Sequence, residues 1–304
     1  MPNPEITALR AALAARVRPP ELADMRKGFD AMGLDRGVPA DVVVTACDAN
    51  GVVAEWTSTP GADQAAAVLY LHGGGYVLGS IDSHRTLAAE IGRAAGSRTL
   101  ALHYRLAPEH PFPAAVDDAL AGYKYLLAKG IAASKIVIAG DSAGGGLVVA
   151  AMLAIKGAGL AQPAGGWGIS PWVDMEAIGD SMDDRAAADP MVQKPGLLGM
   201  AGLYLNGANS RDPLAAPLYG DFTGLAPLLI QVGAAETLLD DAIRLARVAG
   251  AADVAVTLEI WPEMVHVWPL FHLQLAAGRA AIAGAGVWMR AVLAGAPPVS
   301  VKID

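Results

Sequence analysis

The chain has 304 residues, of which 54% are hydrophobic and 17% are charged, and its formal net charge at pH 7 is −8. This length and composition suit one large globular domain with a dense core, and they exclude an intrinsically disordered chain. The acidic balance, together with the lack of any cluster of Lys or Arg, argues against a nucleic-acid partner.

The cysteine count and the apolar runs bear on location. Cys47 is the single cysteine, which excludes an internal disulfide, and its place in an apparent strand favours a buried structural thiol over a nucleophile. Charges at Glu5 and Arg10 leave no signal-peptide core near the N-terminus. The longest uncharged runs are broken by Gly, Pro or His, so we expect no membrane span and a cytoplasmic protein.

The N-terminal part of the chain has the pattern of two apolar helices. Ile6, Leu9 and Leu13 recur at helical spacing, Pro19-Pro20 stops the run, and a second run with the same spacing follows. No strand precedes these helices, so they have no sheet of their own to cover. We expect residues 1–40 to form part of a cap over a later part of the chain.

Strand patterns follow, first as a hairpin around Asn50-Gly51 and then in alternation with helices. This alternation predicts an α/β fold, with a mostly parallel eight-stranded sheet covered by helices on both faces. The expected strands are residues 42–47, 52–58, 66–71, 98–103, 135–140, 165–170, 227–233 and 254–261. The expected helices among them are residues 83–95, 113–129, 142–156, 238–251 and about 270–293.

Residues 174–220 interrupt the alternation. They hold an acidic stretch, residues 180–189, followed by closely spaced apolar residues. We interpret them as an insertion whose helices lie over the sheet edge and form a second part of the cap. The main α/β domain then comprises residues 41–173 and 221–304.

A sharp turn is predicted at Gly140-Asp141-Ser142-Ala143-Gly144, between a strand and a helix. It matches G-x-S-x-G, in which small neighbours leave room for a strained backbone and for a substrate that approaches the serine hydroxyl. The pentapeptide alone is weak evidence, because glycine-rich turns are common. The strand before it and the helix after it are the context that the motif requires.

Three further groups stand just after expected strands, where an open parallel sheet binds its ligands. His72-Gly73-Gly74-Gly75 follows the third strand, Glu236 follows the seventh, and His266 follows the eighth. The order serine, acid, histidine is the one described for α/β-hydrolases. The joint pattern predicts a serine hydrolase in which Ser142 is the nucleophile and His266 is its general base.

Three carboxylates compete for the role of orienting His266. Glu236 is favoured because it stands in a loop, three residues past the strand end. It could instead be an acid stabilised by the dipole of the next helix. Asp240 is the main rival and Asp241 a weaker one, since both fall in the first turns of that helix.

The three glycines after His72 allow backbone N–H groups to face a substrate oxygen without an intervening Cβ. Together with the N–H of Ala143, two N–H groups of this loop would form an oxyanion hole, in which each donor contributes about 3 kcal/mol to transition-state stabilisation. An ordinary turn is the alternative, but a turn needs only one or two glycines.

These motifs resemble the hormone-sensitive-lipase-like branch of the α/β-hydrolases, the bacterial family IV esterases, over about residues 40–295. The matching stretches are His72-Gly-Gly-Gly-Tyr76, Tyr104-Arg-Leu-Ala-Pro-Glu-His-Pro-Phe-Pro113, Gly140-Asp-Ser-Ala-Gly-Gly-Gly146, Ser170-Pro-Trp-Val-Asp174 and the tail around His266. The resemblance implies an α/β-hydrolase fold and hydrolysis of carboxylic esters of short or medium acyl chain through an acyl-enzyme, without a cofactor. It also implies a cap made of the N-terminal helices and the insertion, and oxyanion donors at Gly74, Gly75 and Ala143.

The sequence departs from the family pattern at two places. The acid is commonly Asp in Asp-Pro-Leu, whereas here the matching position is Glu236 in Glu-Thr-Leu. A glutamate acid also occurs in the branch, so the activity is still expected. The frequent Asp-Tyr-Arg is here His103-Tyr-Arg, which makes His103 structural.

Four residues are candidate substrate contacts: Tyr76, Asp141, Met200 and Tyr204. A simple cap core also accounts for Met200 and Tyr204, and a solvated turn equally accounts for Asp141. No set of His, Cys, Asp and Glu has the spacing of metal ligands, so no metal is expected.

Other polar residues are expected to be structural. Arg105 and Glu109 should pair beneath the site, and His72 should brace the glycine loop. Ser83 and His84 are adjacent on a helix, and adjacent side chains do not face each other.

Two other functions remain open beside ester hydrolysis. The same triad could hydrolyse lactones, and a non-catalytic small-molecule receptor is known on this scaffold, as in the plant gibberellin receptors. The presence of His266 together with a serine and an acid favours the enzyme. The expected partner is a small-molecule ester, and related esterases suggest a homodimer formed by pairing of the last strand.

Overall fold

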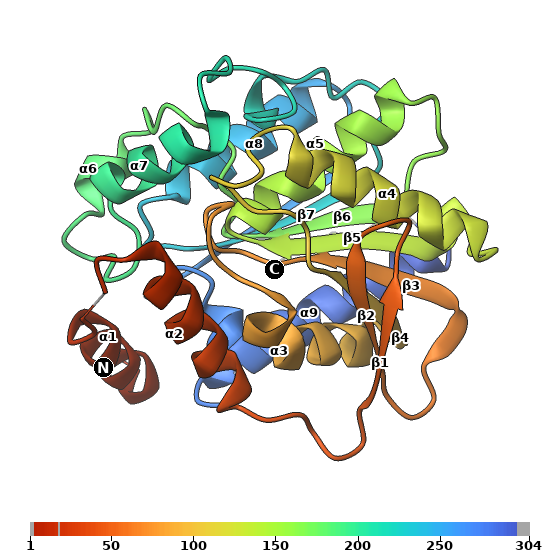
Figure 1. The fold of residues 1–304 in the computed structure, drawn as a ribbon, viewed down its shortest axis with the longest axis horizontal. Helices are drawn as coiled ribbons and strands as arrows, with labels where there is room; N and C mark the ends of the chain where they lie inside the picture. Colours follow the sequence, from red (N-terminus) through yellow and green to blue (C-terminus); the bar gives the residue numbers. More distant parts are fainter. Residues whose placement is uncertain (1–2, 18, 297–304) are drawn as a thin grey trace, which may run out of the picture.

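The computed structural model describes residues 3–17 and 19–296 and contains one eight-stranded sheet (Figure 1). The strand order is β1-β2-β4-β3-β5-β6-β7-β8, and all neighbours are parallel except β1 with β2 and β2 with β4. The strands are β1 (Val43–Asp48), β2 (Val53–Ser58), β3 (Asp63–Leu71), β4 (Ser97–Leu102), β5 (Ile136–Asp141), β6 (Gly165–Ile169), β7 (Leu228–Gly233) and β8 (Val256–Trp261). The predicted mostly parallel sheet is therefore confirmed.

Helices cover both faces of the sheet, as predicted (Figure 1). The helices are α1 (Pro4–Ala14), α2 (Leu22–Leu34), α3 (Ile81–Ala95), α4 (Ala114–Ala128), α5 (Ala143–Gly157), α6 (Ser181–Asp184), α7 (Lys194–Leu205), α8 (Leu239–Ala251) and α9 (Ala276–Leu293). The last helix begins later than predicted, because Trp268–Phe271 forms a separate short 3₁₀ turn that contains Pro269. Among the described residues, no helix is both long and apolar enough to cross a membrane.

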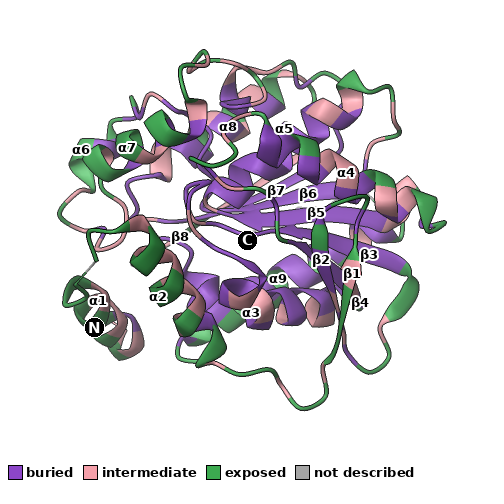
Figure 2. Cartoon of the chain, in the orientation of Figure 1, coloured by how far each residue is buried: buried purple, intermediate pink, exposed green. Residues whose placement is uncertain are grey.

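The core consists of two apolar layers on either side of the sheet. Successive residues of β3 enter alternate layers: Val68 and Tyr70 pack toward α3 and α9, whereas Leu69 and Leu71 pack toward α4 and α5. This alternation follows from the pleat of a strand. Since both layers are buried, the central strands are apolar almost throughout, and Figure 2 shows them buried along most of their length.

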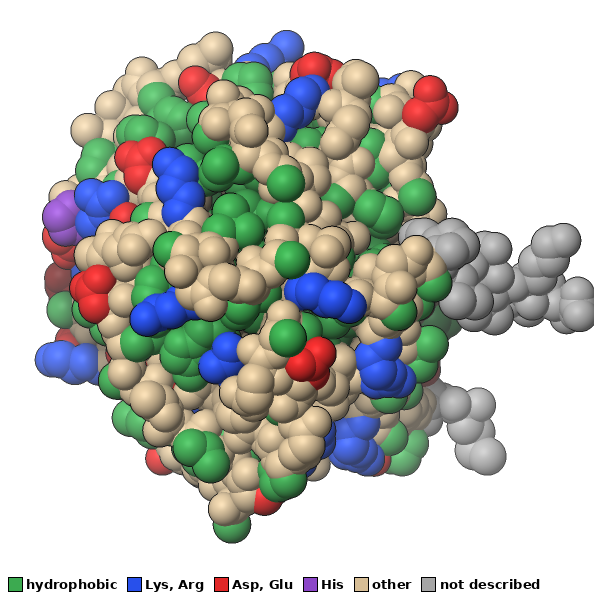
Figure 3. Space-filling model, turned by 90° about the vertical axis from the view of Figure 1, so that its right-hand side faces the viewer, with side chains coloured by type: hydrophobic (Ala, Val, Ile, Leu, Met, Phe, Trp, Pro, Cys, Tyr) green, Lys and Arg blue, Asp and Glu red, His purple; other side chains and the backbone are tan. Residues whose placement is uncertain are grey.

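The sheet has two edges of different character. At one edge, β1 is largely exposed, and Cys47, which was expected to be buried, is only half-buried there. The other edge strand is β8. Pairing of two copies of the chain through this strand stays a prediction. On the face shown in Figure 3, acidic and basic side chains are scattered among apolar ones.

Helix α2 and the insertion, residues 174–220, both reach the loop that follows β3. From α2, the Arg26 guanidinium donates to the Val77 carbonyl at 2.8 Å and to the Ala107 carbonyl at 2.8 Å. From α7, the Tyr204 ring stacks on that of Tyr76 with 3.8 Å between ring centroids. Two segments far apart in sequence therefore pack on one loop.

The predicted Arg105–Glu109 pair is wrong. Arg105 pairs with Asp118 of α4 at 2.7 Å, and Glu109 pairs instead with Arg26 of α2 at 2.8 Å. Asp118 lies one helix turn past the loop, and its carboxylate also accepts from the backbone N–H of Arg105. Because Arg105 pairs with Asp118, Glu109 is available to bind Arg26 of α2.

The contact between α2 and α3 predicts that replacing two glycines of α2 by alanine changes the free energy of unfolding in opposite directions. A Cβ at Gly33 would lie 2.2 Å from the Asp82 carbonyl oxygen, whereas a Cβ at Gly28 would meet nothing within 4 Å. We expect Gly33→Ala to lower the free energy of unfolding by about 1–3 kcal/mol through overpacking. The matched control, Gly28→Ala, should raise it by up to about 1 kcal/mol through helix propensity. Urea unfolding measures both, and equal effects would contradict the close packing.

Candidate active site

The serine turn is built on close backbone contacts. Ser142 lies between β5 and α5 with φ 54° and ψ −121°, a conformation that costs a non-glycine residue strain. A Cβ at Gly144 would lie 2.0 Å from the Leu71 carbonyl oxygen, and one at Gly140 would lie 2.4 Å from the Gly144 oxygen. Both glycines of the motif are therefore required by the packing of the turn.

The structure brings the predicted serine, histidine and acid into one hydrogen-bonded chain. The Oγ of Ser142 lies 2.9 Å from Nε2 of His266, and Nδ1 of His266 lies 2.8 Å from Oε2 of Glu236. Glu236 is fully buried, His266 is nearly so, and Ser142 is half-buried. These distances lie within the range expected for a nucleophile, its base and the acid that orients the base.

The second oxygen of Glu236 is also fixed. Its Oε1 accepts hydrogen bonds from the Ser170 hydroxyl at 2.7 Å and from the Gly233 N–H at 2.6 Å. The Ser170 hydroxyl in turn accepts from the Val267 N–H at 3.1 Å, next to His266. Ser170 thus holds both the acid and the segment of the histidine. In the sequence Ser170 stands out only as part of the Ser170–Asp174 motif, although its place just after β6 is a signal for this edge.

Burial and pairing act in opposite directions on the two ionisable groups. Burial raises the pKa of Glu236, against the lowering effect of the hydrogen bonds from His266 and Ser170. Burial lowers the pKa of His266, but the hydrogen bond and charge of Glu236 outweigh it, and the pKa of His266 is raised above its usual value. The imidazolium that forms during proton transfer is therefore stabilised by Glu236.

The rival carboxylates lie elsewhere. Asp240 accepts from the Ser181 N–H at 2.9 Å. Asp241 accepts from the Val173 and Asp174 N–H groups at 2.9 and 3.1 Å, and burial raises its pKa to about 7. Asp240 therefore binds the insertion, and Asp241 binds the backbone where the chain enters it. Of the three candidates, Glu236 is the one hydrogen-bonded to His266.

The glycine loop offers backbone donors beside the serine turn. Gly74 and Gly75 have φ of 123° and 64°, and a Cβ at Gly74 would lie 2.2 Å from the Leu78 oxygen. Within residues 3–17 and 19–296, the N–H groups of these two glycines have no intramolecular acceptor. The N–H of Ala143, the first residue of α5, has no acceptor within its helix. These are the three predicted oxyanion donors.

Asp141 is not placed to contact a substrate, so that prediction is corrected. Its buried carboxylate faces the underside of the glycine loop, where Oδ1 accepts from the Tyr70 hydroxyl at 2.5 Å and from the Gly73 N–H at 3.0 Å. The Nε2 of His84 lies 3.4 Å from Oδ2. Burial raises the pKa of Asp141, but His84 and Tyr70 outweigh this effect and lower it. Asp141 therefore fixes the loop that carries the donors.

Two histidines lie beneath the same loop. His72 bonds through Nδ1 to the Gly73 carbonyl at 2.8 Å and stacks on the Tyr104 ring, as expected of a brace. Burial lowers its pKa to about 3. The prediction that Ser83 and His84 do not face each other is wrong, because the Ser83 hydroxyl lies 2.7 Å from Nδ1 of His84. Both atoms are close to the backbone, so neighbouring side chains can reach each other.

The other three candidate substrate contacts gather above the loop. Tyr76 and Tyr204 are buried, their rings are parallel within 7°, and their hydroxyls have no partner among the described residues. A Cβ at Gly75 would lie only 2.2 Å from the Sδ of Met200, so the thioether packs directly on this glycine. Trp172 packs on Tyr76 at 5.9 Å between centroids. An aromatic and thioether wall therefore borders the glycine loop.

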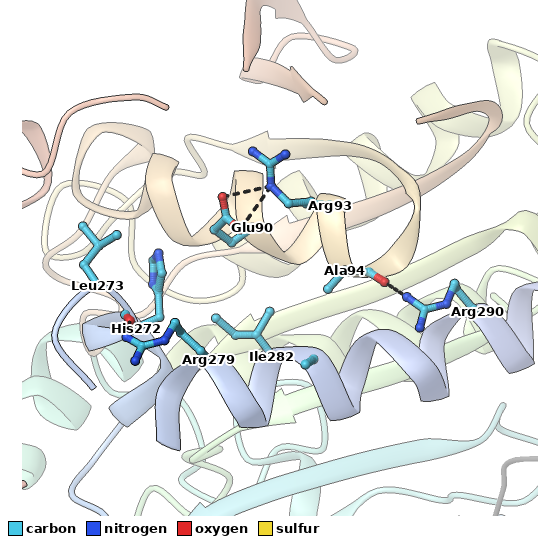
Figure 4. Close-up of a pocket in the computed structure, with 9 residues that line it drawn as sticks. Glu90, Arg93, Ala94, His272, Leu273, Arg279, Ile282 and Arg290 are labelled. Carbon is cyan, nitrogen blue, oxygen red and sulfur yellow. Dashed lines mark hydrogen bonds and ion pairs between the residues drawn. The ribbon is translucent and has the colours of Figure 1, made fainter. Parts of the chain in front are cut away.

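A separate pocket of about 620 Å³ lies between α3 and α9 (Figure 4). Its arginines are already engaged: Arg93 pairs with Glu90, and Arg290 donates to the Ala94 carbonyl. None of the triad candidates lines this pocket. In the part of the chain that the structure describes, no group of three or more His, Cys, Asp or Glu could hold a metal ion.

Comparison with known proteins agrees with this geometry. Residues 68–270 match a family model for the α/β hydrolase fold. An esterase of the bacterial hormone-sensitive lipase family superposes with a TM-score of 0.94 at 46% identity, over 96% of this chain and 99% of that one. The chain belongs to the bacterial hormone-sensitive lipase family of α/β-hydrolases.

Two other proteins are similar to this chain over nearly its whole length. The acetyl-hydrolase of Streptomyces hygroscopicus is 45% identical over 296 residues, which cover 95% of this chain and 97% of that protein. EstE5, in a crystal soaked with p-nitrophenyl butyrate, superposes with a TM-score of 0.93 at 46% identity, over 96% of this chain and 99% of that one.

The assignment of the acid predicts a change in the titration of His266. Because the Glu236 carboxylate raises the pKa of His266, Glu236→Gln should lower that pKa by about one unit or more. Asp240→Asn, which changes a carboxylate four residues along the chain, should leave it unchanged. NMR titration of the His266 ring nitrogens measures both, and a shift in Asp240→Asn alone would reverse the assignment.

Proposed function

We propose that this member of the hormone-sensitive lipase family is a serine carboxylesterase that acts on esters of short to medium acyl chain. The observation that carries the proposal is the continuous chain from the Ser142 hydroxyl through His266 to the buried Glu236, beside three free N–H groups. The names of similar proteins, an acetyl-hydrolase and esterases, support the same activity.

Acylation begins when the Ser142 oxygen attacks the ester carbonyl carbon while Nε2 of His266 takes the hydroxyl proton. The Glu236 carboxylate keeps the Nδ1 proton in place and stabilises the imidazolium. The tetrahedral intermediate collapses when the bond to the alkoxide breaks, and His266 returns the proton to the leaving oxygen. The products are an alcohol and an acyl-Ser142 ester.

Deacylation repeats the steps with water. His266 takes a proton from water, the resulting hydroxide equivalent attacks the acyl carbon, and the proton passes to Ser142 as the carboxylic acid leaves. In both steps negative charge develops on the carbonyl oxygen. The N–H groups of Gly74, Gly75 and Ala143 would donate to that oxygen, at about 3 kcal/mol for each donor.

We assign the cap to residues 1–40 together with the insertion, residues 174–220. Support comes from α2 and α7, which both pack on the loop after β3 through Arg26 and Tyr204. The half-buried Met200 would border the acyl chain, and the buried rings of Tyr76 and Tyr204 would support it from behind. The two tyrosine rings are stacked and buried, so they would leave little room for a long acyl chain beside the glycine loop. We therefore expect short acyl chains to fit best.

The nucleophile is tested by Ser142→Ala in an assay with p-nitrophenyl butyrate. We expect the rate to fall by a factor of ~10⁴ or more, because the attacking oxygen is lost. Ser210→Ala is a matched control, since that hydroxyl bonds Glu176 in the insertion and should leave the rate unchanged. A Ser142→Ala enzyme that keeps more than about a tenth of the wild-type rate would contradict the nucleophile.

The acyl wall is tested by Met200→Ala with a series of p-nitrophenyl esters. Because the Met200 thioether lies against Gly75, its removal should open the site and raise the ratio of kcat/KM for octanoate over butyrate roughly tenfold. Leu203→Ala, at a 42% exposed position of the same helix, should leave the ratio unchanged. Lactones of graded size in the same series show whether the substrate range extends beyond open-chain esters.

A further inference from the structure

The insertion touches the loop that carries the triad acid, through the residue directly after it. The Asp189 carboxylate accepts hydrogen bonds at Oδ2 from the Thr237 N–H at 3.0 Å and from the Thr237 hydroxyl at 3.2 Å. Thr237 follows Glu236 in the chain. Asp189 therefore fixes the backbone directly after Glu236, the residue that carries the proposed catalytic carboxylate.

The other side of Asp189 organises the insertion itself. Its Oδ1 accepts from the N–H groups of Met191 and Val192 at 2.8 and 3.0 Å. The side chain is 2% exposed, and both of its oxygens act as acceptors for amide or hydroxyl donors. Donors from two segments therefore hold the Asp189 carboxylate in place.

Asp189 also adds a charge to the surroundings of His266. Glu236, in the loop after β7, contacts this ring, and Asp189 of the insertion and Asp141 at the end of β5 act on it through their charges. Burial lowers the pKa of His266, and each of the three carboxylates raises it. Asp189 is the one contributed by a segment outside the main α/β domain.

We propose that Asp189 is a positioning residue of the catalytic site, through which the insertion holds the Glu236 loop in the orientation that pairs Glu236 with His266. This inference rests on the proposed esterase function, because it assigns a role toward the same triad. The insertion is then part of the catalytic apparatus as well as a cover.

A second tie between the same two segments provides the matched control. Asp240 of α8 accepts from the Ser181 N–H at 2.9 Å, and the Ser181 hydroxyl donates to the Thr237 carbonyl at 2.6 Å. This tie also docks the insertion on the acid loop. The carboxylates with the largest effects on His266 are Glu236, Asp189 and Asp141, so Asp240→Asn tests the docking of the insertion without removing any of these three.

The experiment compares Asp189→Asn and Asp240→Asn with the wild-type enzyme by two measurements. NMR titration gives the pKa of His266, and labelling with a fluorophosphonate probe across pH gives the reactivity of Ser142. Asparagine keeps the size of Asp189 but removes its charge and places an amide donor toward Thr237. We expect the His266 pKa and the acid limb of the labelling profile to fall by about half a unit or more.

The maximal labelling rate of Asp189→Asn should also fall about tenfold, because a hydrogen bond to a charged group is lost at the acid loop. Asp240→Asn should retain the wild-type pKa and acid limb. An Asp189→Asn enzyme with a wild-type His266 pKa would overturn the proposal, and so would an equal shift in both variants, which would indicate general docking of the insertion.

A milder variant covers the case in which Asp189→Asn does not fold. Thr237→Val removes the hydroxyl and keeps the N–H and the Asp189 charge, so labelling should slow about threefold with an unchanged His266 pKa. A wild-type labelling rate would then overturn the positioning role. If the wild-type enzyme is not labelled at Ser142, the proposed function fails, whereas the His266 titrations still decide the role of Asp189.

Discussion

The serine turn packs backbone to backbone on the end of β3, and its Asp141 carboxylate bonds the glycine loop that follows. A Cβ at Gly144 would lie 2.0 Å from the Leu71 oxygen, and a Cβ at Gly73 would lie 2.2 Å from a carboxylate oxygen of Asp141. This contact places the nucleophile and the free N–H groups at one point of the sheet edge. The histidine and its acid, which come from the other side of that edge, can act only because this contact fixes where Ser142 stands.

The fold and the hydrogen-bonded grouping of Ser142, His266 and Glu236 could be predicted from the sequence because they depend on local patterns. Alternating strands and helices set the sheet, and each residue of the proposed triad stands in the turn or loop that follows a strand. The acid that orients His266 is harder to predict, because Glu236 and Asp240 are close in sequence. They differ in the direction in which the folded chain points their side chains. Boundaries shifted by a few residues where short turns intervened, as at Trp268–Phe271.

Contacts between distant segments could not be predicted in the same way. The Arg26–Glu109 pair joins residues 83 positions apart, and the Ser170–Glu236 hydrogen bond joins residues 66 positions apart. Neither pattern nor spacing specifies such partners, because each depends on how two finished elements meet. Asp141 shows the same limit: its neighbours in sequence indicated an exposed turn, whereas the folded chain places it beneath the glycine loop among Tyr70, Gly73 and His84.

The hydrogen bond from the Thr237 N–H to Asp189 bears on how parts can be exchanged between esterases. Proline has no N–H, so an acid loop of the common Asp-Pro-Leu type could not make this bond. An insertion with an aspartate at position 189 and an acid loop with a free amide at position 237 therefore form a matched set. With the role proposed for Asp189, grafting a foreign cap onto this scaffold to change the substrate would also disturb the pairing of Glu236 with His266.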